Sequence, residues 1–254
     1  MHRHGLAPFF VALALHAGLA LGTTQAHAQA CSIAGATIVE PDAKTGEVST
    51  QEIRQILQDG SAVVIDTRTP SEFAAGHIPG SRNLEVGGAA QVDAVARLTA
   101  GDKSKALVLY CNGPYCQASR RLGEQLVKAG FTNVRRYQLG MPVWRALGGP
   151  TEITLMGLGR VYGRDQTAVF VDARSPEEFA KGSLTGARNL PADLFVAGSI
   201  KQPPFPEDDF NTRIVLFGRD ANQARALAQA LATRPWHNVS YVAATFEEVQ
   251  AAGR

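Results

Sequence analysis

Cys111 is the residue of this sequence best placed to do chemistry. An apolar run over 106–110 precedes it, and the loop 112–117 leads into a predicted helix over 117–129. The backbone N–H groups of such a loop and the positive end of the helix stabilise an anion, so they favour the thiolate, which is the reactive form of cysteine. A cysteine buried only as a small apolar residue fits this Gly-Pro loop poorly. The pattern therefore predicts a nucleophilic thiol at Cys111.

The same loop contains a second cysteine, Cys116, five positions after Cys111. It could be a resolving thiol that forms a disulfide with Cys111 or accepts a group from it, provided that the loop bends enough. It could also be a packing residue without a redox role, and the sequence does not decide between the two. The third of the 3 cysteines, Cys31, has no evident role, and the odd count argues against a fold built on disulfides.

Several polar residues could support this loop or bind a substrate beside it. Arg68 and Glu72 are spaced by one helical turn and are expected to brace the loop as an ion pair. Asp66, at the end of a strand, is expected to accept hydrogen bonds from the backbone or from an arginine rather than to act as a base. Trp144 could line a pocket or belong to the core, and His77 is expected to be structural. The candidate binding residues are Asn112, Gly113, Tyr115, Cys116, Gln117, Arg120, Arg68 and Trp144.

The elements that position these residues occur twice along the chain. The segment 62–84 is matched by 168–190 at a constant spacing and without a gap. Such a match indicates two copies of one domain of about a hundred residues, each large enough for a modest core. We place the copies at 45–150 and 151–254, after an N-terminal extension at 29–44.

Both copies start their elements with the same signals. The β-branched runs 62–66 and 168–172 are typical of strands that are buried on both faces. Each run is followed by a hydroxyl residue, a proline and then a glutamate three positions after the hydroxyl. This pattern predicts capped helix starts at Thr69 and Ser175.

The remaining elements indicate the fold class. Short parallel strands that alternate with helices predict an α/β fold, in which each domain is a small parallel β-sheet flanked by helices on both faces. No first helix is predicted for the second copy, because 156–163 is too rich in glycine. The other elements predicted in the first copy are a helix after Ser49 that stops at Gly60, strands over 106–110 and 134–137, and helices over 117–129 and 142–147.

Taken in order, these motifs resemble a rhodanese (sulfurtransferase) domain. The resemblance covers most of 45–150 and, more weakly, 155–254. No single motif is specific, but the ordered set is. The set consists of the strand ending in Asp66-Thr67-Arg68, the Glu72-Phe73 pair, Gly76-His77-Ile78-Pro79-Gly80, Asn83-Leu84, the unit of strand, Cys111, loop and helix, and Gly140-Met141-Pro142-Val143-Trp144.

The resemblance implies a five-stranded parallel sheet and a cysteine, Cys111, that carries transferable sulfur as a persulfide. Its thiolate would attack the sulfane sulfur of a donor such as thiosulfate or a persulfide. A thiol, cyanide or a protein would then take the sulfur, and the loop N–H groups would stabilise the anionic persulfide. The resemblance implies no metal and no organic cofactor. The expected partners are therefore a small sulfur donor and a thiophilic acceptor.

The second copy departs from the family pattern at the reactive position. Aligning 215–217 with 108–110 places Gly218 opposite Cys111, and residues 155–254 contain no cysteine. Without a thiol this copy cannot carry a persulfide. The departure implies an inactive second domain that packs against the first, shapes a cleft or binds a partner.

Two features narrow the chemistry of the first copy. Related phosphatases of this fold place an arginine six positions after the cysteine, where it binds phosphate through two N–H groups. Here that position is Gln117, which argues against a phosphatase. The loop also has no cation between Cys111 and Gln117, which weakens the case for thiosulfate as the donor. Arg120, Arg121 or Arg68 could substitute.

Two other classes of function stay open. The fold could serve as a non-catalytic binding or adaptor module, which Gly218 and the cation-poor loop favour. The chain could also be a thiol–disulfide redox protein that uses Cys111 and Cys116, although it lacks a Cys-x-x-Cys pair.

The first 28 residues are typical of an export signal. A short basic start, Met1-His2-Arg3-His4, precedes a mostly apolar stretch over 6–21 and the small-residue cleavage motif Ala26-His27-Ala28. Cleavage after Ala28 predicts a periplasmic or secreted protein without stable membrane insertion. An uncleaved anchor and lipidation at Cys31 are the alternatives.

The composition excludes several further classes. The chain has 254 residues, of which 45% are hydrophobic and 19% are charged, unlike a disordered chain. It has 25 Lys and Arg against 23 Asp and Glu, a formal net charge of +2. There is therefore no broad basic field that would hold nucleic acid by its phosphates.

Overall fold

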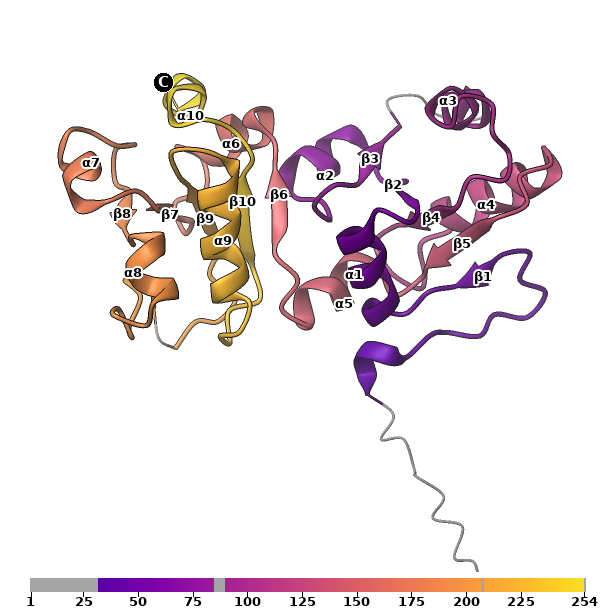
Figure 1. The fold of residues 1–254 in the computed structure, drawn as a ribbon, viewed down its shortest axis with the longest axis horizontal. Coiled ribbons are helices and arrows are strands. Elements are labelled where there is room, and N and C mark those ends of the chain that lie inside the picture. The colour runs from indigo at the N-terminus through magenta and orange to yellow at the C-terminus, as the bar shows by residue number, and fades with distance from the viewer. Residues whose placement is uncertain (1–31, 85–89, 207, 254) are drawn as a thin grey trace, which may run out of the picture. The chain divides into compact units, whose positions relative to one another are not determined.

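The computed structural model describes residues 32–84, 90–206 and 208–253, so the predicted signal segment and Cys31 lie outside the described residues. The described chain forms two five-stranded parallel sheets of identical topology, with strand orders β1-β5-β4-β2-β3 and β6-β10-β9-β7-β8 (Figure 1). This confirms the predicted fold class. The strands are β1 (Gly46–Glu47), β2 (Val63–Asp66), β3 (Arg82–Asn83), β4 (Leu107–Tyr110), β5 (Val134–Tyr137), β6 (Thr151–Ile153), β7 (Val169–Asp172), β8 (Arg188–Asn189), β9 (Ile214–Phe217) and β10 (Val239–Val242).

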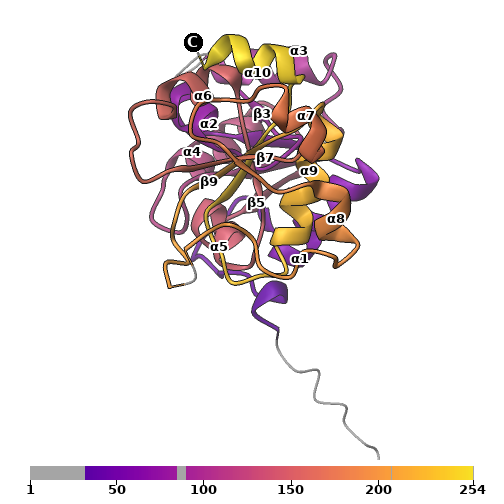
Figure 2. The same cartoon turned by 90° about the vertical axis from the view of Figure 1, so that its left-hand side faces the viewer.

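Helices cover both faces of each sheet. In the turned view, α8 and α9 lie together, away from α6 and α10 (Figure 2). The helices are α1 (Thr50–Asp59), α2 (Pro70–Ala75), α3 (Ala90–Leu98), α4 (Ala118–Lys128), α5 (Gly140–Ala146), α6 (Leu155–Val161), α7 (Pro176–Ala180), α8 (Ala192–Val196), α9 (Ala221–Leu231) and α10 (Phe246–Ala252), with a 3-10 turn at Ile33–Gly35.

The central strand β4 shows why helices are needed on both faces. Its side chains alternate: Leu107 and Leu109 join the cluster under α3 and α4, whereas Val108 and Tyr110 join the cluster under α1 and α5. All four are fully buried. Each fully buried apolar side chain of this size contributes roughly 1.5–3 kcal/mol to folding. The strand β9 repeats the pattern in the second sheet.

The predicted helix starts are confirmed by their capping geometry. The side chains of Ser49, Thr69 and Ser175 each accept a hydrogen bond from the backbone N–H of the third residue of the following helix. That third residue is a glutamate, and its carboxylate accepts a hydrogen bond from the backbone N–H of the cap residue. Pro70 occupies the first turn of α2. Gly60 ends α1 with φ 65°, a left-handed conformation that glycine adopts without steric cost.

The structure contains the helix α6, so the prediction that the second copy has no first helix is wrong. Thr154 caps this helix by accepting a hydrogen bond from the N–H of Gly157. A Cβ at Gly157 would overlap the carbonyl oxygen of Ala74 in α2. Glycine therefore lets the backbones of α2 and α6 approach closely, and this packing outweighs the low helix propensity of the segment.

A backbone bridge joins the two halves of the described chain next to this contact. The N–H of His77 donates to the carbonyl of Glu152 at 3.0 Å, and the N–H of Glu152 donates back at 2.9 Å. The imidazole of His77 is buried, with its Nδ1 2.9 Å from the carbonyl oxygen of Phe73. These contacts place His77 between α2 and β6.

A charge cluster lies at the β1 edge of the first sheet. Arg136, only 2% exposed, donates to Glu40 at 2.7 Å and lies 3.6 Å from Glu47. Burial above all, and the charge of Glu40 to a smaller extent, raise the pKa of Glu47 from 4.5 to about 7, although Arg136 lowers it. Glu47 is therefore a carboxyl group that folding makes harder to ionise.

We expect a Glu47→Gln variant to lose the part of the pH dependence of protein stability that Glu47 causes. Between pH 4.5 and about 7 the folded carboxyl binds more protons than the unfolded one, so wild-type stability falls as pH rises through that window. Glutamine does not titrate, so the variant has a melting temperature close to wild type at pH 5 and roughly 2 °C or more above it at pH 8. Calorimetry at both pH values measures the difference. A variant less stable than wild type at pH 8 would show that the attraction to Arg136 dominates.

Candidate active site

Cys111 directly follows β4 at the carboxyl end of the sheet. Its neighbours in the sheet are set by register, because Tyr110 pairs with Asp66 of β2 and with Tyr137 of β5. The side chain of Cys111 is only 3% exposed. Its carbonyl oxygen accepts a hydrogen bond from the N–H of Met141 at 3.1 Å. The carboxyl ends of parallel strands are where α/β folds place ligands and reactive groups.

The loop 111–117 is held in one shape by glycines. Gly113 has φ 101°, and its carbonyl accepts a hydrogen bond from the N–H of Cys116 at 3.0 Å, which turns the chain back. Gly140, with φ 60°, packs against the loop so closely that a Cβ there would overlap the carbonyl oxygen of Cys111 and lie 2.6 Å from the Gly113 nitrogen. Because neither Gly113 nor Gly140 has a side chain, the loop can lie directly against the start of α5.

The two cysteines of this loop form a disulfide. The Cα atoms of Cys111 and Cys116 are 6.2 Å apart, within the range that a disulfide requires. Of the two roles that the sequence left open for Cys116, the structure places it as the partner of Cys111. In this state neither residue is a free thiol.

The ion pair predicted between Arg68 and Glu72 is wrong. Arg68 instead donates to Asp66 with contacts of 2.6–3.1 Å, and the pair is buried, with side chains 6% and 0% exposed. Glu72 caps α2 and accepts a hydrogen bond from the amide of Asn112 at 2.5 Å. Hydrogen bonding, from Thr69 above all and then from Asn112, lowers the pKa of Glu72 although burial opposes the shift. Glu72 thus braces the loop through Asn112.

Asp66 accepts hydrogen bonds, as predicted, and so anchors the strand end beneath the loop. Besides Arg68, it accepts a hydrogen bond from the backbone N–H of that residue at 2.9 Å and from the Tyr110 hydroxyl at 2.7 Å. Burial and the charge of Asp66 raise the pKa of Tyr110 well above its ordinary value. The Tyr110 hydroxyl also accepts from the N–H of Ile78 and contacts the Ser81 hydroxyl. No pattern in the sequence indicated these roles of Tyr110 and Ser81.

The candidate binding residues fall into three groups. Five of them belong to the loop itself, where Tyr115 is 96% exposed and Gln117 occupies the start of α4 without a side-chain cap. Arg120 is neutralised by Glu124 at 3.0 Å and Glu40 at 3.9 Å. Arg68 is committed to Asp66. Both arginines therefore have carboxylate partners, and neither points freely at Cys111.

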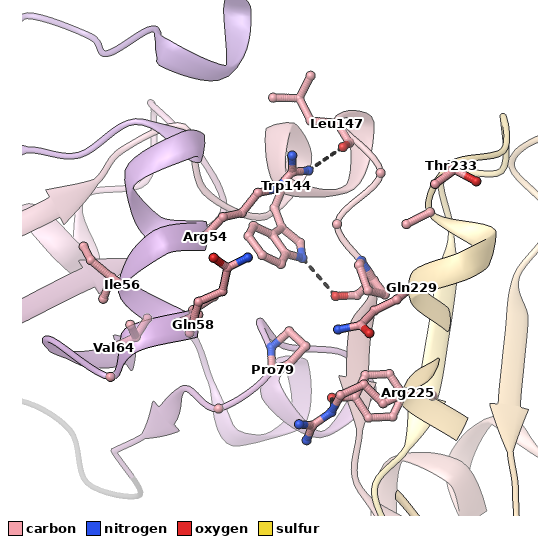
Figure 3. Close-up of a pocket in the computed structure, with 18 of the residues that line it drawn as sticks. Arg54, Ile56, Gln58, Val64, Pro79, Trp144, Leu147, Arg225, Gln229 and Thr233 are labelled. Atoms are coloured by element: carbon pink, nitrogen blue, oxygen red, sulfur yellow. Dashed lines mark hydrogen bonds between the residues drawn. The ribbon is translucent and has the colours of Figure 1, made fainter. Parts of the chain in front are cut away.

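Trp144 is not brought to the loop. It is buried in the core cluster under α1 and α5, and its indole N–H donates to the carbonyl of Pro150 at 3.0 Å. It also lines a cavity of about 680 Å³ together with Arg54, Arg225 and Gln229 (Figure 3). No residue of the loop 111–117 lines this cavity.

The second half of the chain ends its central strand differently. Phe217 of β9 pairs with Asp172 as Tyr110 pairs with Asp66, so Gly218 occupies the place of Cys111. Residues 218–220 connect β9 to α9, four fewer than the loop 111–117. The carboxylate of Asp220 accepts hydrogen bonds from the first N–H groups of α9 at 2.8 and 3.0 Å. An acidic side chain of the protein therefore occupies the end of the helix where an anion would bind.

The buried pair of the first half recurs in the second. Arg174 donates to Asp172 at 2.6 Å, with side chains 8% and 0% exposed. Phe217 has no hydroxyl to replace that of Tyr110, and the Ser183 hydroxyl donates to Asp172 at 2.7 Å instead. The scaffold of the strand end is thus preserved where the cysteine is not.

The described residues hold neither a candidate metal site nor a candidate membrane span. Within 32–84, 90–206 and 208–253, no group of three or more His, Cys, Asp or Glu residues could hold a metal ion. In the same ranges, no helix has the length and apolar character of a membrane span.

The rhodanese-like domain family matches the chain twice, at residues 49–147 and 162–252. The chain is 31% identical over 100 residues to thiosulfate sulfurtransferase GlpE of Pseudomonas aeruginosa, covering 39% of this chain and 84% of the relative. It is also 31% identical over 105 residues to an HTH-type transcriptional regulator of Mycobacterium tuberculosis, covering 41% of this chain and 44% of the regulator. The aligned part thus spans less than half the length of that regulator.

Solved structures give matches of the same kind. A thiosulfate sulfurtransferase from Pseudomonas aeruginosa is 24% identical with a TM-score of 0.33, over 78% of this chain and 43% of that one. A Rhodanese_3 like domain from Anabaena is 28% identical with a TM-score of 0.32, over 36% of this chain and 99% of that one. Because the two domain matches together span more than half of the sequence, the chain belongs to the rhodanese-like domain family, with two such domains in tandem.

Proposed function

We propose that this protein is a sulfurtransferase whose first domain carries sulfane sulfur as a persulfide on Cys111. One observation carries the proposal. Cys111 ends the central strand of a rhodanese-like domain, in a loop that leads to the uncapped start of α4. The relatives named as thiosulfate sulfurtransferases support the same class of reaction.

The proposed reaction has two steps that both use this loop. The reduced Cys111 thiolate attacks the sulfane sulfur of a donor, and the donor's remainder leaves with the bonding electron pair. An acceptor then attacks the outer sulfur and restores the thiolate. The first turn of α4 has no acidic residue, so its N–H groups can stabilise the anionic persulfide.

The charges near the loop favour a persulfide or polysulfide donor over thiosulfate. Of the three arginines that could bind a dianionic donor, Arg120 and Arg68 have carboxylate partners, and Arg121 is exposed on α4. We propose a small sulfane donor of low charge and, as acceptor, a thiol, cyanide or a protein thiol. We also propose export through the predicted signal segment, which would place this reaction in the periplasm or outside the cell.

The second domain is proposed to have no sulfur-carrying role. Gly218 supplies no thiol, and Asp220 occupies the start of α9. Its elements α6 and β6 pack against α2 of the first domain (Figure 1). These contacts support a role of the second domain in holding α2 in position.

A matched pair of variants tests the site. In a Cys31→Ser background, Cys116→Ser leaves Cys111 as the loop thiol, and Cys111→Ser leaves Cys116. After reduction and exposure to a polysulfide or thiosulfate, we expect the first variant to gain about 32 Da, the mass of one sulfur atom, on the peptide containing Cys111. The second should gain below about a tenth of that amount, because its thiol lies outside the strand-end position. Intact-mass and peptide-mass measurements give the result.

The proposal fails if the Cys116→Ser chain takes up no sulfur from any sulfane donor, or if both variants take it up equally. An unchanged cellular function in a Cys111→Ser variant would favour the alternative of a non-catalytic adaptor module. The alternative of a thiol–disulfide redox protein is favoured by the Cys111–Cys116 disulfide. It requires that the protein oxidise or reduce a protein dithiol at a useful rate without any sulfur donor.

A further inference from the structure

We propose that Cys116 is a resolving cysteine that releases the sulfur held on Cys111 as sulfide, so that the first domain is a dithiol-driven persulfide reductase. The proposal rests on the proposed function, because it needs a persulfide on Cys111. The disulfide between the two residues would then be the product state of the reaction.

The loop is shaped to bring the second sulfur to the first. Gly113, at φ 101°, and the hydrogen bond from the Cys116 N–H to the Gly113 carbonyl return the chain toward the strand end. The Cα atoms of the two cysteines are then 6.2 Å apart. The contact of Gly140 with Cys111 and Gly113 fixes this turn. Cys116 can therefore reach Cys111 without any movement of the strand.

The same geometry says which sulfur is attacked. In the disulfide, the Cys116 sulfur is bonded to the Cys111 sulfur itself, so the inner sulfur of a persulfide on Cys111 is within its reach. Attack on that inner sulfur, from the side opposite the outer sulfur, breaks the S–S bond of the persulfide. The outer sulfur is therefore the leaving group.

The step balances without any outside reagent. The anionic persulfide that the loop holds takes up a proton from water on its outer sulfur, and this Cys111–S–SH form and the Cys116 thiolate give the Cys111–Cys116 disulfide and HS⁻. The S–S bond to the outer sulfur breaks, that sulfur leaves with the electron pair, and a new S–S bond forms. The sulfane sulfur is reduced to sulfide while the two cysteines are oxidised. The enzyme is reset by a dithiol reductant, which supplies two electrons and two protons and becomes a disulfide.

Two properties of the neighbourhood favour this outcome over transfer to a bulky acceptor. Cys111 is only 3% exposed, so an external acceptor has restricted access to its sulfur, whereas Cys116 is already inside the loop. An internal thiol also acts at a high effective concentration, which accelerates attack over the same reaction between separate molecules.

The test compares the fate of sulfur in the full chain with and without Cys116. In the Cys31→Ser background, the reduced protein and its Cys116→Ser variant each receive one equivalent of polysulfide. With Cys116 present, we expect about one equivalent of sulfide beyond the amount that loading alone releases in the Cys116→Ser variant, and a chain about 2 Da lighter than the reduced protein. The Cys116→Ser variant keeps the gain of about 32 Da on Cys111 and loses it at least about tenfold more slowly.

A matched control moves the thiol by one residue. Tyr115→Cys combined with Cys116→Ser keeps a thiol in the loop but at a side chain that is 96% exposed in the protein. We expect this variant to retain the persulfide as Cys116→Ser does. Fast sulfide release from it would show that any nearby thiol suffices and would overturn the role of the loop geometry.

The outcomes separate this inference from the proposed function. If the Cys116→Ser variant never acquires sulfur on Cys111, the sulfurtransferase proposal fails. If it does, but the chain with Cys116 holds its persulfide equally long and releases no more sulfide than the variant, only the resolving role fails. Sulfur found on Cys116 without sulfide release would likewise overturn it, since it would mean attack on the outer sulfur.

Discussion

An Asp66→Ala variant will lose about 3–5 kcal/mol of the free energy of unfolding of the first domain, because it leaves the guanidinium of Arg68 buried without its carboxylate. The Arg68 side chain is 6% exposed, so water cannot replace the lost partner. The Tyr110 hydroxyl also loses the acceptor that it bonds at 2.7 Å. Chemical denaturation followed by tryptophan fluorescence and circular dichroism measures the loss.

The repeat supplies a matched control for this variant. Asp172→Ala removes the equivalent partner of Arg174 in the second domain, and we expect a similar loss of stability there. Sulfur loading onto Cys111 is then expected to fall in the Asp66→Ala chain and to persist in the Asp172→Ala chain at temperatures where both are folded. If Asp66→Ala unfolds within about 1 kcal/mol of wild type, the buried pair contributes far less than its geometry indicates.

A Gly140→Ala variant will displace the reactive loop and slow sulfur loading onto Cys111 by at least about tenfold. The added Cβ would overlap the carbonyl oxygen of Cys111 and crowd the Gly113 backbone, so one of these segments must move. Displacements near 1 Å at a reacting group can cost about a hundredfold in rate. The left-handed φ of 60° adds about 1–2 kcal/mol of backbone strain for alanine.

Gly60→Ala separates the clash from the backbone strain. Gly60 has nearly the same φ, 65°, but its Cβ would have no neighbour within 4 Å. We expect this control to lose about 1 kcal/mol of stability and to load sulfur at the wild-type rate. The rate of sulfur loading onto Cys111, measured by mass spectrometry of quenched samples of both variants, separates the two effects. Equal loading rates for Gly140→Ala and wild type would show that the loop does not depend on this contact.

Elements marked by local signals were predictable from the sequence. The helix starts at Ser49, Thr69 and Ser175 are encoded by three or four adjacent residues, and the strands β2 and β4 by short apolar runs. The position of Cys111 followed from the strand that precedes it. These predictions needed no knowledge of which segments meet in space.

Features that depend on distant contacts were not predictable in the same way. Glu72 could have bonded Arg68 by spacing alone, but the buried carboxylate of Asp66 takes the arginine and leaves Glu72 for Asn112. The helix α6 depends on close packing against α2, which makes its glycines an advantage. The two-residue strands β1, β3 and β8 exist only through pairing with their neighbours and carry no pattern of their own. The glycine of the Gly140-Met141-Pro142-Val143-Trp144 motif and the loop 112–117 were both visible in the sequence, but the contact between them was not.

The shorter connection between β9 and α9 limits how the two domains can change by mutation. A substitution at Gly218 can supply a thiol, but it cannot supply the four residues that the connection lacks or remove the Asp220 carboxylate from the first N–H groups of α9. An insertion and at least two substitutions would have to coincide before the second domain had the same loop as the first. A single codon change at Cys111, by contrast, suffices to remove the thiol of the first domain. Mutation therefore removes the thiol of the first domain more readily than it creates an equivalent thiol and loop in the second.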